Sequence, residues 1–223
     1  MPHGVVTPGY FDHRPLLPIY GIPDDLGGKN VLDVGTADGF WAFEFEERGG
    51  QVTALDVDST AELDLPPVLL RTAAEHGLID PLGGGFALAH RVLGSGVKRI
   101  AGSVYDLDPN RFGRFDLVHA GDILLHLRDP IRALHHICSV TGGEALLSDV
   151  FDPTLASSSR DENQLVRYLG GWVTAGWWIP ALGTLVQMVA DAGFSDVEVV
   201  TTYRLAARGM QKGPWRAVLR ARP

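Results

Sequence analysis

Residues 31–40, with the sequence VLDVGTADGF, constrain the fold of this chain more than any other stretch. Their apolar, β-branched beginning is typical of a buried parallel strand, and Gly35 and Gly39 indicate a tight turn that opens into a helix. Glycine has no Cβ atom, so the backbone can adopt positive φ there and approach a ligand closely. The helix that follows begins with free N–H groups. The stretch therefore predicts a strand–turn–helix nucleotide site.

A second acid supports this interpretation. Residues 51–57 (QVTALDV) are typical of the next strand, and Asp56 falls 23 residues after Asp33. A carboxylate at the end of the second strand of such a sheet can accept both hydroxyls of a ribose. An ordinary strand–turn–helix corner needs no spaced second acid, so the two acids indicate an adenosine ligand.

The order of residues in the turn favours one adenosine cofactor over another. A dinucleotide site has the pattern G-x-G-x-x-G, in which a glycine seats the pyrophosphate. This turn instead reads Asp33-x-Gly35-x-Ala37-x-Gly39. S-adenosylmethionine has no diphosphate to neutralise, and its ammonium group suits an acid at the end of a strand. The turn therefore favours S-adenosylmethionine.

The D-x-G-x-[GA]-x-G pattern resembles motif I of the class I S-adenosylmethionine-dependent methyltransferases. In that family the loop after the third strand contacts the adenine ring through a side chain and a backbone amide. Residues 102–107 (GSVYDL) match this loop, with Ser103 where the family usually has an acid and Asp106 as the alternative. The resemblance implies S-adenosyl-L-methionine as cofactor, held by residues of the turn and the strand ends. They are Asp33, Gly35, Thr36, Ala37, Gly39, Asp56, Val57, Ser103, Val104, Tyr105 and Gly121.

Three further segments narrow the resemblance: residues 40–41 (FW), 126–130 (HLRDP) and 176–180 (GWWIP). Over most of residues 5–200 the chain is similar to the tRNA 5-methoxyuridine/5-oxyacetyluridine methyltransferase-like group, which modifies wobble uridine. Members of that group use carboxy-S-adenosylmethionine in some cases. The sequence departs from the group in having no evident RNA-binding face, so only the fold and the cofactor class are carried over.

The order of the expected elements predicts one doubly wound α/β domain over residues 1–223, of the Rossmann-like class I methyltransferase type. Its sheet should have seven mostly parallel strands, with the last one antiparallel. Residues 1–30 read as an irregular arm, residues 59–85 as a partly irregular connection, and residues 152–180 as an aromatic cap insertion. Ligands bind such sheets at the carboxyl ends of the strands. Strands are expected at 31–34, 51–56, 97–101, 114–120, 143–151, 197–203 and 215–219, and helices at 40–48, 86–93, from 130, and at 182–192.

The end of the fourth strand is the predicted place of methyl transfer. Asp122 and His126 lie just beyond it and are the candidate acid–base residues. Histidine suits this role because its ordinary pKa of about 6.5 allows it to accept a proton near neutrality. The alternative for His126 is a structural one, in which it ties the loop to its helix by hydrogen bonds.

Aromatic and polar side chains in the arm and the cap are the candidate acceptor-binding residues. The arm has an unusual density of such side chains and is expected to fold over the cofactor mouth; the alternative is surface packing alone. The cap places three of the five tryptophans within seven residues. They are expected to line the acceptor pocket, and the alternative is that they belong to the core. The predicted substrate-binding residues are Tyr10, His13, Arg14, Tyr168, Trp172, Trp177 and Trp178.

Charge argues against a nucleic-acid partner. Residues 1–150 carry 11 Lys and Arg against 21 Asp and Glu, whereas residues 151–223 carry 8 against 6. A protein that neutralises several phosphates normally has a basic face. The one candidate strip is Arg204, Arg208, Lys212, Arg216, Arg220 and Arg222, which we interpret as the decoration of two edge strands.

Other features of the sequence limit where the protein can be located and what it can bind. No apolar run approaches the roughly 18 to 20 residues of a membrane span, and the first residues show no signal-peptide pattern. Cys138 is a lone cysteine in an apolar setting, which favours a buried thiol and a cytoplasmic protein. The eight His are scattered, so no metal site is predicted. The oligomeric state is not determined by these patterns.

Three functions are compatible with these patterns. The leading hypothesis is transfer of a methyl group from S-adenosylmethionine to an oxygen or nitrogen of a small-molecule metabolite, in natural-product (secondary-metabolite) biosynthesis. The second is a tRNA wobble-uridine methyl- or carboxymethyltransferase that uses the C-terminal basic strip. The third is a cofactor-binding protein that has lost its chemistry.

Overall fold

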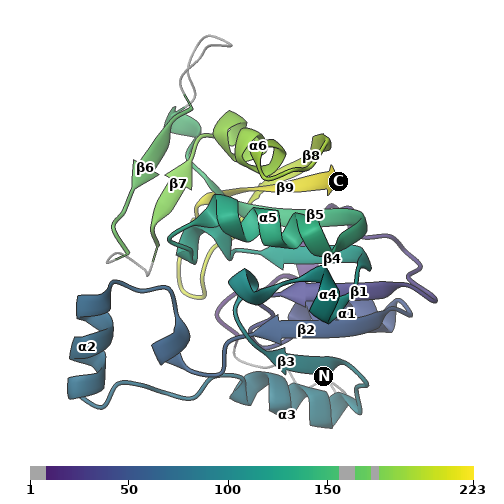
Figure 1. Cartoon of the computed structure of the whole chain (residues 1–223), viewed down its shortest axis with the longest axis horizontal. Helices are drawn as coiled ribbons and strands as arrows, with labels where there is room; N and C mark the ends of the chain where they lie inside the picture. Colours follow the sequence, from purple (N-terminus) through teal and green to yellow (C-terminus); the bar gives the residue numbers. More distant parts are fainter. Residues whose placement is uncertain (1–8, 156–163, 172–175) are drawn as a thin grey trace.

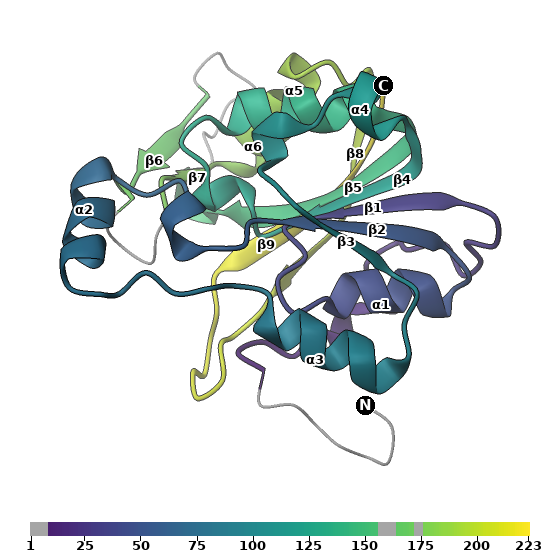
Figure 2. The same ribbon diagram turned by 60° about the horizontal axis from the view of Figure 1, so that its bottom comes forward.

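A computed structural model of the chain describes residues 9–155, 164–171 and 176–223. A twisted sheet lies between two layers of helices (Figures 1 and 2). The seven strands have the order β3-β2-β1-β4-β5-β9-β8. They are β1 (Asn30–Val34), β2 (Gln51–Asp56), β3 (Lys98–Ala101), β4 (Phe115–Gly121), β5 (Thr141–Phe151), β8 (Asp196–Arg204) and β9 (Trp215–Arg222).

The sheet confirms the predicted doubly wound fold. The pairs β1–β2, β2–β3, β1–β4 and β4–β5 are parallel, and β9 runs antiparallel to both β5 and β8. The chain builds the sheet outward from β1 in one direction and then outward from β4 in the other. The order therefore reverses between β1 and β4, and a crevice for a ligand opens at the carboxyl ends of strands at such a point.

Helices cover both faces of the sheet. In Figure 2, α1 and α3 lie below it, and α4, α5 and α6 lie above it. Leu32 and Val34 of β1 pack into the cluster that contains α5 residues, whereas Val31 packs into the cluster that contains α1 residues. Successive strand residues point to opposite faces, so a strand covered on both faces reads as a continuous apolar run. The helices of these layers are α1 (Phe40–Glu47), α3 (Gly84–Leu93), α4 (Pro109–Phe112), α5 (Pro130–Val140) and α6 (Leu182–Asp191).

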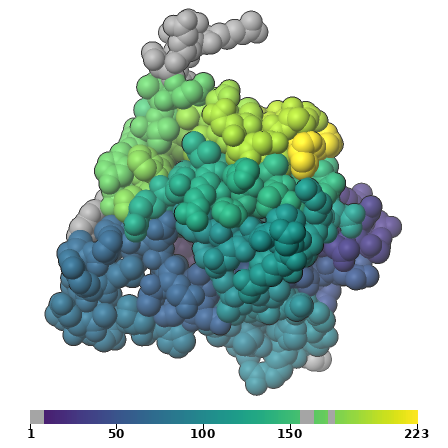
Figure 3. Space-filling model, in the orientation of Figure 1, coloured from purple at the N-terminus to yellow at the C-terminus, as the bar shows by residue number. Residues whose placement is uncertain are grey.

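Two segments project from this body on the same side of the molecule (Figures 1 and 3). The first is the β2–α3 connection, which was expected to be partly irregular and contains the helix α2 (Pro67–Glu75). Proline is tolerated in the first turn of a helix, so Pro66 and Pro67 begin this helix rather than prevent it. The second is the cap, where β6 (Val166–Tyr168) pairs antiparallel with β7 (Trp178–Pro180).

No helix in the described part of the chain is long and apolar enough to cross a membrane.

Candidate active site

The glycine turn after β1 has the backbone that its sequence demands. Gly35 has φ of 72° and Gly39 has φ of 88°, both in the region that favours glycine. A Cβ atom on Gly35 would lie 3.0 Å from Cδ1 of Ile123, and one on Gly39 would lie 2.5 Å from the ring of Phe43. Ala37 also has positive φ, at 48°. The turn therefore needs glycine for both conformation and space.

Asp56 holds this turn against the end of β2. Its Oδ2 accepts a hydrogen bond from the Ala37 amide at 2.7 Å, and its Oδ1 accepts one from the Val57 amide at 2.8 Å. Burial raises the pKa of Asp56, and the two amide hydrogen bonds oppose that rise. Each carboxylate oxygen keeps a lone pair for a further donor. Asp56 thus lies beside the glycine turn, and its predicted contact with a ribose stays a prediction.

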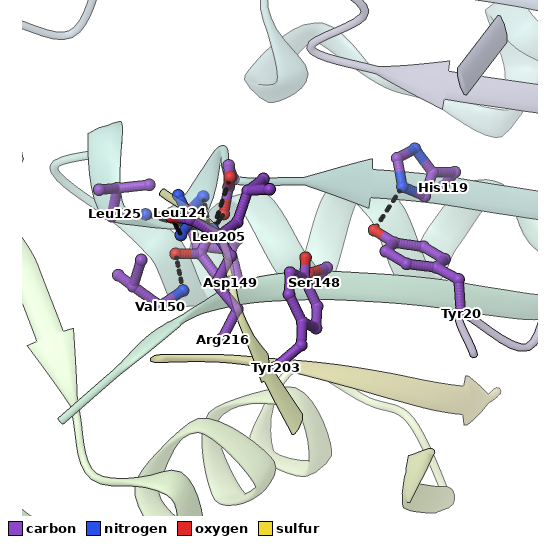
Figure 4. A network of polar contacts seen from close by, with 11 residues as sticks. Tyr20, His119, Leu124, Leu125, Ser148, Asp149, Val150, Tyr203, Leu205 and Arg216 are labelled. Carbon is purple, nitrogen blue, oxygen red and sulfur yellow. Dashed lines mark hydrogen bonds and ion pairs between the residues drawn. The ribbon is translucent and has the colours of Figure 1, made fainter. Parts of the chain in front are cut away.

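Asp33 lies under the turn and is almost fully buried. Its Oδ1 is 2.6 Å from Nδ1 of His119 on β4, and Nε2 of His119 is 2.9 Å from the hydroxyl of Tyr20 (Figure 4). Oδ2 of Asp33 is buried and has no hydrogen-bond partner among the described residues. The carboxylate therefore keeps one oxygen available for a donor. Its predicted contact with an ammonium group stays a prediction.

Tyr20 and His119 were missed by the sequence analysis. Asp33 and His119 are direct neighbours across the parallel β1–β4 pair. That register brings a histidine inside an apolar strand next to an acid 86 residues away. Burial raises the pKa of Tyr20 well above its ordinary value, so the phenol keeps its proton for hydrogen bonding. The presence of His119 in a buried strand was the available signal, but its partner depends on the register.

The loop after β3, at the predicted adenine position, is held together by its own hydrogen bonds. The Ser103 side chain accepts a hydrogen bond from the Tyr105 amide, and Asp106 Oδ2 accepts one from the Ser103 amide at 3.1 Å, which completes a capping box. Val104 is buried beneath the loop. The alternative acid Asp106 is thus engaged within the loop itself, while Tyr105 reaches outward from it.

The end of β4 carries a strained residue. Asp122, directly after Gly121, has φ of 53°, which is uncommon for a residue with a side chain and recurs at functional sites. Its amide donates to the carbonyl of Ser148 at 2.7 Å. Both of its carboxylate oxygens are 2.8 Å from Nε of the buried Arg216. The next residue, Ile123, covers Gly35. The structure therefore brings Asp122 beside the turn and fixes it with an arginine.

The candidate base His126 ends the 3₁₀ helix η5 (Leu124–His126) and is exposed. A buried acid that the sequence analysis missed holds this helix. Asp149 on β5 accepts hydrogen bonds from the amides of Leu124 and Val150, both at 2.7 Å (Figure 4). Burial raises the pKa of Asp149, and the nearby carboxylate of Asp122 raises it further. Asp149 thus sets the path of the chain between β4 and α5.

The arm contributes two inward-facing rings. The Phe11 ring lies 5.4 Å from the guanidinium of Arg216, and the His13 ring lies 5.3 Å from Phe40 and 5.5 Å from Trp41. Burial lowers the pKa of His13. By contrast, the predicted residues Tyr10 and Arg14 have exposed side chains, and Arg14 pairs with the neighbouring Asp12.

The aromatic residues of the cap differ in how far they are buried. Trp177 is buried, with 7% of its surface exposed, whereas Tyr168 is 62% exposed. Trp178 is half-buried and its ring lies 4.9 Å from that of Tyr168. Trp172 lies outside the described residues. Trp177 is therefore as buried as a core residue, whereas Trp178 and Tyr168 are more exposed to solvent.

Trp178 also lines a cavity of about 320 Å³ between the cap, α5 and α6. The walls are mostly apolar, and the charged lining residues are Arg128, Asp129 and Asp191. No residue of the glycine turn lines it. The apolar lining residues are Pro130, Ile131, Val166, Trp178 and Met188.

Comparison with known proteins places this site in context. A family model described as a methyltransferase domain matches residues 14–199. A tRNA U34 carboxymethyltransferase of Citrifermentans bemidjiense is 22% identical over 196 residues, which cover 85% of this chain and 52% of that protein. A ubiquinone biosynthesis O-methyltransferase of Xanthomonas oryzae is 34% identical over 127 residues, which cover 56% of this chain and 44% of that protein. The chain thus spans about half the length of the curated relatives it matches.

Solved structures share the fold. The 1,6-didemethyltoxoflavin-N1-methyltransferase of Burkholderia thailandensis superimposes with a TM-score of 0.60 at 20% identity, covering 95% of this chain and 79% of that one. An S-adenosylmethionine-dependent methyltransferase of Mesorhizobium loti gives a TM-score of 0.56 at 17% identity, covering 95% and 97%.

Proposed function

This chain belongs to the methyltransferase-domain family and uses S-adenosylmethionine as its methyl donor, and from that premise we propose that it methylates an oxygen or nitrogen of a small molecule in a biosynthetic pathway. When bound, S-adenosylmethionine supplies an electrophilic methyl group on a sulfonium. The chain's own residues then have to hold the cofactor, orient the acceptor and exclude water.

Two features of the described residues fit the cofactor. The turn at Gly35 and Gly39 takes positive φ at the carboxyl end of β1, and a glycine turn of this kind lets the backbone approach a ligand closely. The buried Oδ2 of Asp33 is an acceptor without a donor among these residues, and an ammonium group is a donor of the right charge. In this proposal Asp33 binds the amino group, Asp56 binds the ribose, and the loop at Ser103 and Val104 lies against the adenine.

Acceptor orientation falls to the end of β4. Asp122 has both oxygens held by Arg216, so its direction is fixed before any substrate arrives. Methyl transfer gains most of its rate from holding the two reacting atoms in near-attack geometry. We therefore assign Asp122 an orienting role, in which it accepts a hydrogen bond from the acceptor. His126 stays the predicted proton acceptor for an acceptor that arrives protonated.

The observation that carries the preference for a small molecule is the pairing of the C-terminal basic strip. Arg216 pairs with Asp122, Arg220 pairs with Glu198, and Arg222 pairs with Asp196. A further acid, Glu144, lies 3.4 Å from both Arg220 and Arg222. These side chains are neutralised by acids of the same protein, whereas phosphate binding requires cations that release counterions.

The second candidate is a tRNA-modifying enzyme. It is favoured by the extent of the likeness to the tRNA U34 carboxymethyltransferase, which covers 85% of this chain against 56% for the ubiquinone-pathway enzyme. In that case Arg208 and Lys212, the exposed members of the strip that lie between β8 and β9, would have to make the phosphate contacts.

One labelling experiment separates the two candidates. The protein is incubated with S-adenosylmethionine carrying a labelled methyl group, with either a fractionated metabolite extract or total tRNA as acceptor. We expect label in a small-molecule fraction and none in tRNA. Label in tRNA that decreases steeply as salt rises would overturn the proposal in favour of the second candidate.

A further inference from the structure

One carboxylate outside the predicted site joins segments that are distant in the sequence. Asp64 lies between β2 and α2, and its Oδ2 accepts hydrogen bonds from the hydroxyl of Tyr105 at 3.0 Å and from the amide of Arg128 at 2.6 Å. Its Oδ1 lies 3.1 Å from Nη2 of Arg128. Its main-chain oxygen accepts a hydrogen bond from the indole N–H of Trp177. A single residue therefore contacts the loop after β3, the start of α5 and the cap.

Tyr105 carries this connection to the predicted adenine position. It belongs to the loop at Ser103 and Val104, the predicted adenine contacts, and is itself one of the predicted cofactor-binding residues. Its hydroxyl accepts a hydrogen bond from the Asp129 amide at 3.1 Å while it donates to Asp64. Burial raises the pKa of Tyr105 to about 12, so the hydroxyl keeps its proton at neutral pH. The loop and Asp64 are thus linked by a donor that does not titrate under working conditions.

Trp177 carries the connection to the cap. Its amide donates to the carbonyl of Leu125 at 2.6 Å, and its ring lies 5.0 Å from the guanidinium of Arg128. The indole N–H of Trp178 donates to the carbonyl of Arg128 at 3.1 Å. Both tryptophans therefore depend on Arg128, and Arg128 is held in turn by Asp64.

We propose that Asp64 is a positioning residue that couples the adenine loop to the cap, so that binding of S-adenosylmethionine stabilises the cap over the acceptor. The proposal rests on the proposed function, because it takes the adenine to lie at Ser103 and Val104. A ligand that orders the loop also orders the groups bonded to it, and the coupling is reciprocal: an acceptor held by the cap favours cofactor binding by the same factor. Charge-assisted hydrogen bonds suit such a link because they are stronger and more directional than neutral ones.

Hydrogen exchange followed by mass spectrometry on the full chain tests the coupling, with S-adenosylhomocysteine as the probe. In the wild type we expect S-adenosylhomocysteine to slow exchange at residues 103–106, and to slow exchange at residues 164–171 and 176–182 by about fivefold or more. Two variants interrupt the link: Tyr105→Phe removes the hydroxyl and keeps the ring, and Asp64→Asn removes the charge and keeps the shape. In both, saturated with S-adenosylhomocysteine, we expect cap protection below about twofold. Asp64→Asn should also keep its affinity for S-adenosylhomocysteine within about threefold of the wild type.

Asp108→Asn is the matched control. Asp108 lies four residues after Val104, its carboxylate caps α4 by accepting a hydrogen bond from the Asn110 amide, and it takes no part in the Asp64 contacts described above. This variant should keep the full cap protection. A purely structural role for Asp64 predicts faster cap exchange in the absence of S-adenosylhomocysteine with an unchanged protection ratio, so the ratio is the decisive measurement.

The outcomes distinguish the two levels of the proposal. Binding of S-adenosylhomocysteine that leaves the wild-type cap unprotected overturns the coupling and leaves the proposed function intact. So does full cap protection in Tyr105→Phe and Asp64→Asn. Calorimetry that detects no binding of S-adenosylhomocysteine to the wild type overturns the cofactor assignment and the coupling together.

Discussion

The predicted cofactor half and the predicted acceptor half of this site are built by different means. The cofactor half consists of the glycine turn and the ends of β1 and β2, where backbone geometry dominates: two glycines at positive φ and an acid that binds main-chain amides. The predicted acceptor half consists of the arm, the end of β4 and the cap, and in and around it side-chain pairs between distant segments dominate, such as Asp122–Arg216 and Asp64–Arg128. The first half should be intolerant of added atoms, and the second should be intolerant of removed ones.

The largest expected effect belongs to the acceptor half. Trp177→Ala should lower the free energy of unfolding by roughly 3 to 5 kcal/mol, because it empties the space of a buried aromatic ring. Urea unfolding of the variant measures this loss. Trp215, which is 37% exposed, provides the matched control, and Trp215→Ala should cost much less. Normal stability of Trp177→Ala, combined with a raised KM for the acceptor, would instead place Trp177 in the acceptor pocket without a core role.

The cofactor half should respond most to an added side chain in its turn. Gly35→Val should weaken binding of S-adenosylhomocysteine by about 100-fold or more, because a β-branched residue is strained at positive φ and its Cβ atom would crowd Ile123. Calorimetry measures the affinity, and circular dichroism checks the fold.

Gly28→Val isolates the effect of strain alone. Gly28 has φ of 73°, close to that of Gly35, but a Cβ atom added to Gly28 would meet no atom of the described residues within 4 Å. This variant should lose some stability and keep its affinity. Equal loss of affinity in both variants would mean that the Gly35 turn acts through stability and not through the ligand.

A moderate effect should follow from removing the acid at the end of β2. Asp56→Ala should weaken binding of S-adenosylhomocysteine by about 1.5 to 3 kcal/mol, because it removes charge-assisted hydrogen bonds and loosens the turn at Ala37. Titration calorimetry with wild type and variant at one salt concentration gives the difference. Unchanged affinity would show that Asp56 does not bind the ribose and only stabilises the turn.

The smallest effect concerns the boundary between the halves, at Asp149. Its folded-state pKa is raised by burial from 3.8 to about 7, so the folded protein binds this proton more tightly than the unfolded chain. The stability that this bound proton contributes is therefore fully present below pH 3.8 and is lost as the pH rises towards about 7. Above that pH the contribution changes no further. Asp149→Asn removes this dependence.

The difference between the two proteins is the quantity to measure. From pH 4 to pH 7, wild type should lose roughly 1 kcal/mol per pH unit relative to Asp149→Asn, on top of a constant offset for altered hydrogen bonds to Leu124 and Val150. Chemical unfolding at several pH values gives this difference. Parallel curves would show that folding does not raise the pKa of Asp149.

Local sequence patterns were sufficient to predict the glycine turn, the seven strands of the sheet and the cofactor class. These depend on local chemistry: residues 31–40 contain a strand, a glycine turn and a helix start in one continuous run, and Asp56 follows at the distance of the next strand. The strand periodicity also placed β2, β3, β4 and β5 close to their observed bounds. Helix α2 was missed because Pro66 and Pro67 were interpreted as a break, whereas proline is tolerated in the first turn of a helix.

Which side chains of distant segments meet depends on the packing of the folded chain. Asp33 meets His119 because of the register of β1 against β4, Asp122 meets Arg216 across 94 residues, and Asp64 meets Trp177 across 113 residues. Such pairings depend on how distant segments pack, and a one-residue shift of a strand would turn every one of its side chains to the other face. Local patterns fix the backbone of the cofactor half, whereas the contacts of the acceptor half exist only once the whole chain has folded.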